Sequence, residues 1–122
     1  MSTDSRKSLG RLGEQLAAEH VERLGWQIVE RNYQSRLGEL DLVAVDGSTL
    51  VFVEVKTCRF GRGRPWDSLH ERKQVQVRRI AGVWFNQRRA TPFFEHVRFD
   101  GIGVLVDEAD RLVSLDHLEG AF

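Results

Sequence analysis

The chain has 122 residues, of which 30% are charged and 41% hydrophobic, and its 18 basic and 18 acidic side chains give a formal net charge of zero. This length and composition predict a single domain over residues 1–122 with one hydrophobic core and a flexible N-terminus at 1–7. No apolar run is long enough to span a membrane, segment 1–7 lacks the apolar stretch of a signal peptide, and Cys58 is the only cysteine. We therefore expect a cytoplasmic protein without an internal disulfide or a membrane partner, and the scattered histidines argue against zinc.

Residues 5–24 carry apolar side chains at helical spacing and are followed by a glycine, a natural stop, so they predict an amphipathic helix. Gly10 and Gly13 lie inside this helix, where glycine costs stability unless something packs closely. Glu14 falls at the margin of the apolar stripe. It is either a surface glutamate or an acid that reaches toward the strands that follow.

Residues 26–33 read as a first strand, and two further apolar runs, 38–45 and 50–56, flank the turn signal Asp46-Gly47-Ser48-Thr49. Runs rich in β-branched residues around such a turn predict a β-hairpin. If Gly47 and Ser48 form the two-residue loop, Asp41 lies directly across from Glu54. If the loop is Asp46-Gly47 instead, Asp41 is only a diagonal neighbour of Glu54.

In the first register the hairpin has two different faces, because side chains alternate along a strand. One face is apolar throughout and carries Leu40, Leu42, Ala44, Val51, Val53 and Val55. The opposite face is apolar near the turn and polar at its far end, where it carries Glu39, Asp41, Glu54 and Lys56. This arrangement predicts a hairpin that is buried on one side along its whole length.

The polar end of the hairpin places two carboxylates opposite each other beside a lysine. Opposed like charges destabilise a sheet, and Mg²⁺ or Mn²⁺ would compensate them because both ions prefer carboxylate oxygens. A metal held by Asp41 and Glu54 next to Lys56 suits phosphodiester hydrolysis. The alternative is an ordinary Glu39–Lys56 cross-strand ion pair, with both acids pointing into water at a sheet edge.

Residues 57–65 lack apolar periodicity and predict a loop, which opens a strongly basic part of the chain. Residues 56–89 contain ten lysines and arginines against two acids, a local balance of +8, so the remainder of the chain carries −8. Such a block is either a phosphate-binding face or a solvated helix face with a flexible loop. Under the first interpretation nucleic acid would be bound by Arg59, Arg62, Arg64, Arg72, Lys73, Arg78 and Arg79.

A capping box over 68–71 predicts a second helix that ends near Arg88. Gln74 and Gln76 at its start would either hold a water or phosphate near the acids or be plain surface. Strands are predicted over 97–106 and 112–115, with Asp100 in a structural pairing rather than as a ligand. The order α-β-β-β-α-β-β predicts an α/β fold with a mixed central sheet flanked by helices.

The motifs Gly38-Glu39-x-Asp41, Val53-Glu54-Val55-Lys56-Thr57 and Arg98-Phe99-Asp100, with the opening Gly10-x-x-Gly13-Glu14-x-x-Ala17, resemble those of the YraN-like family. This bacterial family is assigned to the PD-(D/E)XK nuclease superfamily and is similar to archaeal Holliday-junction resolvases. The resemblance covers roughly residues 8–120. Two departures stand out: Leu40 takes the place of the proline that often precedes the first acid, and Cys58 occupies a position that is often basic.

The resemblance implies a restriction-endonuclease-like core and a Mg²⁺- or Mn²⁺-dependent nuclease. Asp41, Glu54 and the carbonyl of Val55 would be metal ligands, with Glu14 as an accessory acid, and Lys56 would orient the attacking water with help from Gln74. It further implies nucleic acid as partner, DNA before RNA and branched DNA included, and a homodimer. The alternatives are a non-catalytic nucleic-acid-binding module that keeps the fold, and a structural or adaptor protein that binds no nucleic acid.

Overall fold

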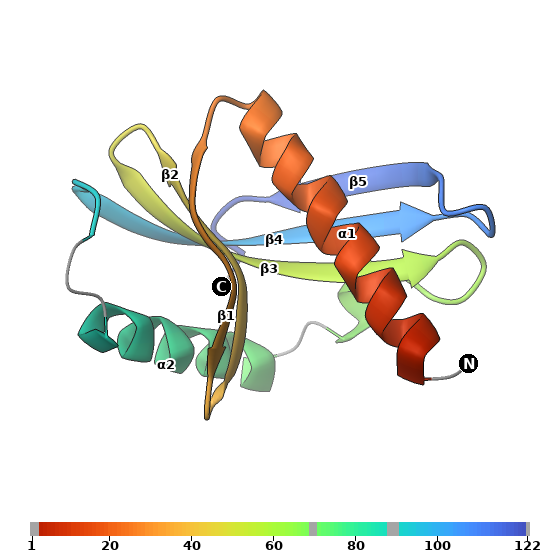
Figure 1. The fold of residues 1–122 in the computed structure, drawn as a ribbon, viewed down its shortest axis with the longest axis horizontal. Helices are drawn as coiled ribbons and strands as arrows, with labels where there is room; N and C mark the ends of the chain where they lie inside the picture. The colour runs from red at the N-terminus through yellow and green to blue at the C-terminus, as the bar shows by residue number, and fades with distance from the viewer. Residues whose placement is uncertain (1–2, 69–70, 88–90, 122) are drawn as a thin grey trace.

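Two helices and five strands follow one another in the predicted order α-β-β-β-α-β-β (Figure 1). The computed structural model describes residues 3–68, 71–87 and 91–121. The elements are α1 (Thr3–Arg23), β1 (Gln27–Ser35), β2 (Gly38–Asp46), β3 (Thr49–Arg59), the short 3-10 helix η1 (Pro65–Ser68), α2 (Glu71–Gln87), β4 (His96–Val106) and β5 (Leu112–Leu118). The fold is α/β with a mixed sheet, as the sequence predicts.

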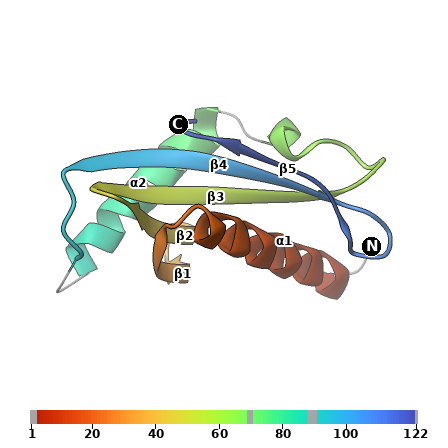
Figure 2. The ribbon, with the colours of Figure 1, turned by 90° about the horizontal axis from the view of Figure 1, so that it is seen from above.

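The strands form one sheet in the order β1-β2-β3-β4-β5. Neighbours pair antiparallel except β3 and β4, which run parallel and are joined through η1 and α2. Figure 2 shows β3 and β4 side by side along nearly their whole length, and in Figure 1 α1 crosses in front of β3, β4 and β5. The central strand β3 is therefore buried on both faces, which explains its long apolar run.

Each face of the sheet carries its own hydrophobic cluster. Val51, Val53 and Val55 pack in the cluster beneath α1, while Leu50 and Phe52, which alternate with them, pack in the cluster beneath α2. The α2 cluster is rich in aromatic rings, with Phe52 5.5 Å from Trp84 and stacked on Phe99 at 5.3 Å between ring centroids. The two-residue alternation of β3 thus builds both halves of the core.

The register of the β2–β3 hairpin is the one set by the Gly47-Ser48 loop. Asp46 pairs with Thr49 and Leu42 with Val53, which excludes the alternative loop. One detail of the predicted faces is wrong, because Leu40 packs in the α2 cluster rather than with Leu42 beneath α1. The β2–β3 ladder ends at Leu42, and the regular alternation does not continue past that point.

Several boundaries differ from those predicted. β3 continues through Thr57 to Arg59, inside the segment predicted as a loop, because parallel pairing with β4 extends to Arg59–Val106. β5 also runs further than predicted, to Leu118. α1 begins at Thr3, within the segment 1–7 expected to be flexible. Part of the predicted capping box (69–70) and Arg88 lie outside the described residues.

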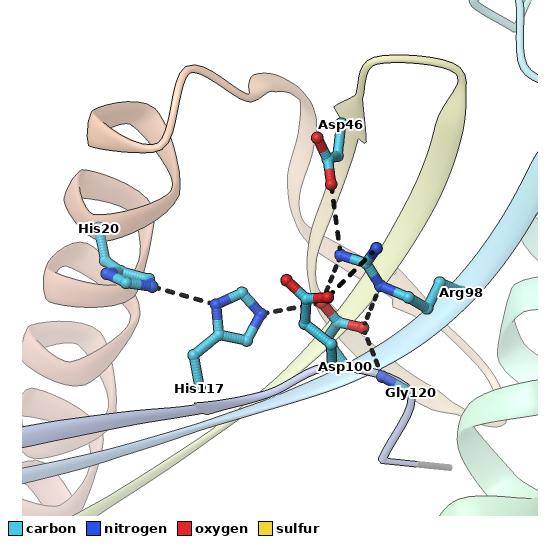
Figure 3. Close-up of polar contacts among 7 residues, drawn as sticks. His20, Asp46, Arg98, Asp100, His117 and Gly120 are labelled. Atoms are coloured by element: carbon cyan, nitrogen blue, oxygen red, sulfur yellow. Dashed lines mark hydrogen bonds and ion pairs between the residues drawn. The ribbon is translucent and has the colours of Figure 1, made fainter.

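Asp100 is the centre of a buried ion-pair network, which confirms its predicted structural role (Figure 3). Its side chain is 0% exposed and accepts two hydrogen bonds from Arg98, at 2.8 and 3.0 Å, and one from the Gly120 N–H at 3.0 Å. His117 Nε2 lies 2.8 Å from the same carboxylate, and its Nδ1 lies 3.0 Å from Nε2 of His20. The network ties β4, β5 and α1 together.

Candidate functional site

The candidate site lies where β2 and β3 separate. Beyond the Leu42–Val53 pair the Asp41 carboxylate takes over as partner of β3, because its Oδ2 accepts a hydrogen bond of 2.7 Å from the Val55 N–H. Asp41 is 9% exposed and Glu54 only 4%. The alternative in which both acids point into water is therefore wrong.

Helix α1 packs directly against β3 at Gly13. A β-carbon on Gly13 would lie 1.7 Å from Oγ1 of Thr57 on β3, so no other residue permits the helix to come this close without displacement. The next residue, Glu14, is thereby held at the end of the hairpin. Glu14, Glu39 and Asp41 each offer a carboxylate oxygen within 4.8 Å of the others.

Two acids of this cluster, Asp41 and Glu14, have a raised pKa. Burial raises the pKa of Asp41 to about 9, helped by the charge of Glu54 and opposed by the hydrogen bond from Val55. Burial, followed by the charge of Glu39, also raises the pKa of Glu14 to about 7. The Asn32 side-chain amide, oriented with its nitrogen toward Glu14, donates to Oε1 at 2.8 Å. Without a cation, the cluster is therefore partly protonated at neutral pH.

Two lysines meet at the other buried acid. Lys56 Nζ lies 3.6 Å and Lys73 Nζ 3.1 Å from Oε1 of Glu54. Lys56 thus pairs with Glu54 two residues before it on β3, and the Glu39–Lys56 ion pair considered above is not among the described contacts. Lys56 lies on β3 and Lys73 on α2, so elements that are distant in the sequence converge on Glu54.

These residues line one cleft of about 450 Å³. A second hollow of about 390 Å³ adjoins it and shares Gly10, Glu14 and Glu39 with it. The polar residues lining the cleft are Arg6, Glu14, Glu39, Asp41, Glu54, Lys56, Thr57, Lys73 and Gln76. Val55 also lines it, so the structure brings together Asp41, Glu54, Val55, Lys56 and Glu14 of the predicted site.

Gln74 is not among the described residues that line the cleft. Gln76, one of the two glutamines considered at the start of this helix, lines it instead and donates a hydrogen bond of 2.7 Å to the Leu37 carbonyl. That bond holds Gln76 against the tight turn before Gly38, whose φ is 135°. Gln76 therefore belongs to the wall of the cleft.

The residues expected to bind nucleic acid lie in different surroundings. Arg59 pairs with Asp110 at 2.8 Å and donates to the Asp107 carbonyl at 2.8 Å, so it supports the turn between β4 and β5. Arg78 covers the ring of Phe99, 4.5 Å from its centroid. Arg62, Arg64 and Arg79 are exposed, and the side chain of Arg72 lies outside the described part. Of the six with described side chains, Lys73 alone lines the cleft.

The sequence alone does not assign four of the residues that line the two hollows, namely Glu39, Arg6, Lys7 and Arg11, to the candidate site. Glu39 was assigned to face Lys56 but joins Glu14 and Asp41, because β2 leaves the ladder at Asp41. Arg6, Lys7 and Arg11 line the two hollows from α1. The helical repeat contains the signal, since Arg6 and Glu14 are two helical turns apart and so share one face of the helix.

Neither helix has an apolar segment of the length needed to cross a membrane, as far as the described residues go.

Residues 13–104 match the family model described as uncharacterised protein family UPF0102. The chain is 44% identical over 121 residues to a UPF0102 protein of Pelotomaculum thermopropionicum, with 98% of each chain covered. It is 40% identical over 130 residues to a UPF0102 protein of Acidothermus cellulolyticus, covering 99% of this chain and 98% of the relative. These matches confirm the resemblance to a YraN-like family of uncharacterised proteins, and the chain belongs to the uncharacterised protein family UPF0102.

Proposed function

We propose that this protein is a nuclease that uses Mg²⁺ or Mn²⁺ to hydrolyse phosphodiester bonds of nucleic acid. The observation that carries the proposal is the cleft in which Glu14, Glu39 and Asp41 converge beside Glu54 and two lysines. Carboxylates, a buried acid and ammonium groups in one open cleft are what metal-assisted hydrolysis of a phosphate ester requires. DNA is the preferred substrate class, branched DNA included, on a restriction-endonuclease-like core.

The residues present fit a hard divalent cation. Asp41 and Glu54, with Glu14 as a further acid and the Val55 carbonyl, would hold it. Asp41 and Glu14 converge with Glu39, which is close enough to join them, and Glu54 lines the same cleft. Their oxygens match the preference of Mg²⁺ and Mn²⁺. Burial, and after it the charge of neighbouring acids, raises the pKa of Asp41 and of Glu14, and a bound cation would offset both costs. When bound, such an ion polarises a phosphoryl oxygen and lowers the pKa of a water.

Other side chains in the cleft supply the remaining interactions that hydrolysis requires. Lys56 is placed to orient the attacking water and to offset negative charge on the phosphate in the transition state. Lys73 adds a second ammonium on the α2 side of the cleft. A homodimer would present two such clefts to a symmetric junction.

A cleavage assay with labelled single-stranded, duplex, flap and four-way-junction DNA, and with RNA, tests the proposal. Wild type in Mg²⁺ or Mn²⁺ is compared with Glu54→Ala, Lys56→Ala and the control Glu108→Ala, an exposed acid in the turn between β4 and β5. We expect cutting that needs metal, is lost in the first two variants and persists in the control. Cutting that survives Glu54→Ala and Lys56→Ala would place the activity elsewhere, in this protein or in a contaminant.

Binding without cutting would favour the alternative function, a nucleic-acid-binding module that keeps the fold. The two functions separate cleanly because binding is measurable in EDTA, where hydrolysis cannot proceed through a metal. Salt-sensitive binding of every substrate, with no cleavage in either metal, is the result that would replace the nuclease by this module. No binding at low salt would contradict both.

A further inference from the structure

One face of α1 carries basic side chains that line the cleft and the adjoining hollow. Arg6, Gly10 and Glu14 follow one another at intervals of four residues, so they form one row along the helix. Arg6 lines the cleft, Lys7 and Arg11 line the adjoining hollow, and Gly10 and Glu14 line both. All three basic side chains are exposed. The acids therefore have cations on two sides, from α1 and from Lys56 and Lys73.

Packing against the described residues does not explain the glycine at position 10. Glycine inside a helix costs stability relative to alanine, and Gly13 offsets that cost through its contact with Thr57. A β-carbon on Gly10, in contrast, would meet nothing within 4 Å, and its φ is not in the positive range. The open space above it belongs to the cleft and the adjoining hollow. Gly10 thus keeps the helix backbone accessible at the point where the two meet.

The accessible backbone at Gly10 and the charged side chains around it together indicate which kind of ligand binds there. A chain of phosphodiesters carries negative charge at regular intervals and is repelled by carboxylates unless cations lie beside them. Arg6 and Lys7 supply those cations on the far side of Gly10 from Glu14, and Arg11 lies between Gly10 and Glu14 along the helix. A bulky group reaching from the carboxylates to Arg6 and Lys7 has to pass over Gly10.

We propose that a nucleic-acid strand crosses α1 at Gly10, with phosphates next to the scissile one held by Arg6, Lys7 and Arg11. This inference rests on the nuclease function proposed above and assigns to it a binding surface on α1, which the basic segment 56–89 does not include. Gly10 is the position at which the strand lies against the helix. The three basic residues position the strand and take no part in the chemistry.

Binding of fluorescein-labelled duplex and single-stranded DNA, followed by anisotropy in EDTA, tests the surface. We expect Gly10→Leu to weaken binding at least tenfold, and the double variant Arg6→Ala/Lys7→Ala to weaken it at least fivefold with a shallower dependence on salt. Gly10→Ala is expected to raise the melting temperature, because it improves helix propensity, while it weakens binding. Circular dichroism verifies that each variant is folded.

Two controls match these variants. Gly82 in α2 also has open space around its β-carbon position but does not line the cleft, so Gly82→Leu should leave binding unchanged. Arg23→Ala removes a charge from the last turn of α1 and should have little effect.

The outcomes separate this inference from the function on which it rests. Wild-type protein that binds and cuts DNA, with equal binding by Gly10→Leu and Arg6→Ala/Lys7→Ala, overturns the α1 surface and leaves the nuclease standing. Equal losses in Gly82→Leu and Gly10→Leu also overturn it, because the effect would then belong to the helices in general. Wild-type protein that neither binds nor cuts nucleic acid overturns the function and the surface with it.

Discussion

Gly13 of α1 lies against Thr57 of β3 so closely that a β-carbon on the glycine would be 1.7 Å from the threonine Oγ1 and 2.7 Å from its Cβ. The contact joins the first helix to the central strand one residue before Glu14. It is the reason that an acid from the helix lies within reach of acids from the hairpin. Stability and the geometry of the candidate site therefore depend on the same contact.

Gly13→Ala is expected to destabilise the protein by about 1–3 kcal/mol, because the added carbon forces α1 away from β3. Urea unfolding measures this, with Gly82→Ala as the control that should stabilise by up to about 1 kcal/mol. The double variant Gly13→Ala/Thr57→Gly should recover part of the loss specifically through this contact, after correction for Thr57→Gly alone. Additive effects in that cycle would contradict the close contact.

The protonation of Asp41 predicts how stability depends on pH in metal-free protein. The pKa of Asp41 is about 9 in the folded protein against an ordinary 3.8, so the folded state binds more protons than the unfolded state between these values. The stabilisation is fully present below about pH 4 and is lost as the pH rises toward 9. The free energy of unfolding in EDTA should therefore fall over this range.

Asp41→Asn should flatten this pH dependence and raise stability at pH 8 by about 1 kcal/mol or more, because the amide can still accept the Val55 hydrogen bond without carrying charge. Adding Mg²⁺ should stabilise wild type increasingly as the pH rises and should stabilise Asp41→Asn little. Urea unfolding at pH 5, 7 and 9 with and without metal gives both results. An equal slope in the two proteins would remove Asp41 as its source.

The Asp100 network, which links β4, β5 and α1, predicts the opposite pH behaviour. Burial alone would raise the pKa of Asp100, but hydrogen bonds from His117, Arg98 and the Gly120 N–H outweigh it and leave the pKa below its ordinary value. Its contribution is present above about pH 4 and is lost as the pH falls through the lowered pKa of the folded protein. Asp100→Asn should cost about 3 kcal/mol at pH 7, since it leaves Arg98 without its buried partner.

The measurement is urea unfolding at pH 7 and pH 3, where the difference between the two proteins should shrink. Asp116→Asn, an exposed acid on β5, is the matched control and should change little. Mn²⁺ binding should be unaffected in both variants, because none of the network residues lines the cleft. A loss of metal binding in Asp100→Asn would show that the network acts on the site.

How far the sequence could predict this structure depends on how local each feature is. The hairpin register follows from a two-residue turn and β-branched alternation, both contained in residues 38–56, and the structure confirms it. The length of β3 could not be predicted in the same way, because its last residues pair with β4, across η1 and α2. A segment without apolar periodicity gives no local sign that a distant strand will pair with it.

The candidate site also combines features that follow from the local sequence with features that depend on distant contacts. The neighbourhood of Asp41 and Glu54 follows from hairpin geometry, whereas the position of Glu39 depends on Asp41 bonding the Val55 N–H and ending the ladder. Charge counting along the chain predicts that Arg59 contacts phosphate, but it does not reveal that Arg59 pairs with Asp110 in the turn between β4 and β5. Local charge balance cannot say which basic residues find an acid in the folded protein.

Lys73 provides the last prediction, because it competes with any cation for Glu54. Its ammonium lies 3.1 Å from the carboxylate, closer than that of Lys56 at 3.6 Å. Lys73→Gln removes a positive charge beside a proposed metal ligand and should tighten Mn²⁺ binding by roughly fivefold, corresponding to about 1 kcal/mol of relieved repulsion. The same change should weaken DNA binding, since Lys73 also faces the cleft.

Isothermal titration with Mn²⁺ measures the first effect and anisotropy with labelled DNA in EDTA the second. Arg79→Gln is the matched control, an exposed cation on the same helix that does not line the cleft, and it should leave Mn²⁺ affinity unchanged. Tighter Mn²⁺ binding together with weaker DNA binding is expected only if Lys73 repels the metal at Glu54 and attracts the DNA in the cleft. Weaker Mn²⁺ binding in Lys73→Gln would instead mean that the ion pair holds Glu54 in the orientation that the metal needs.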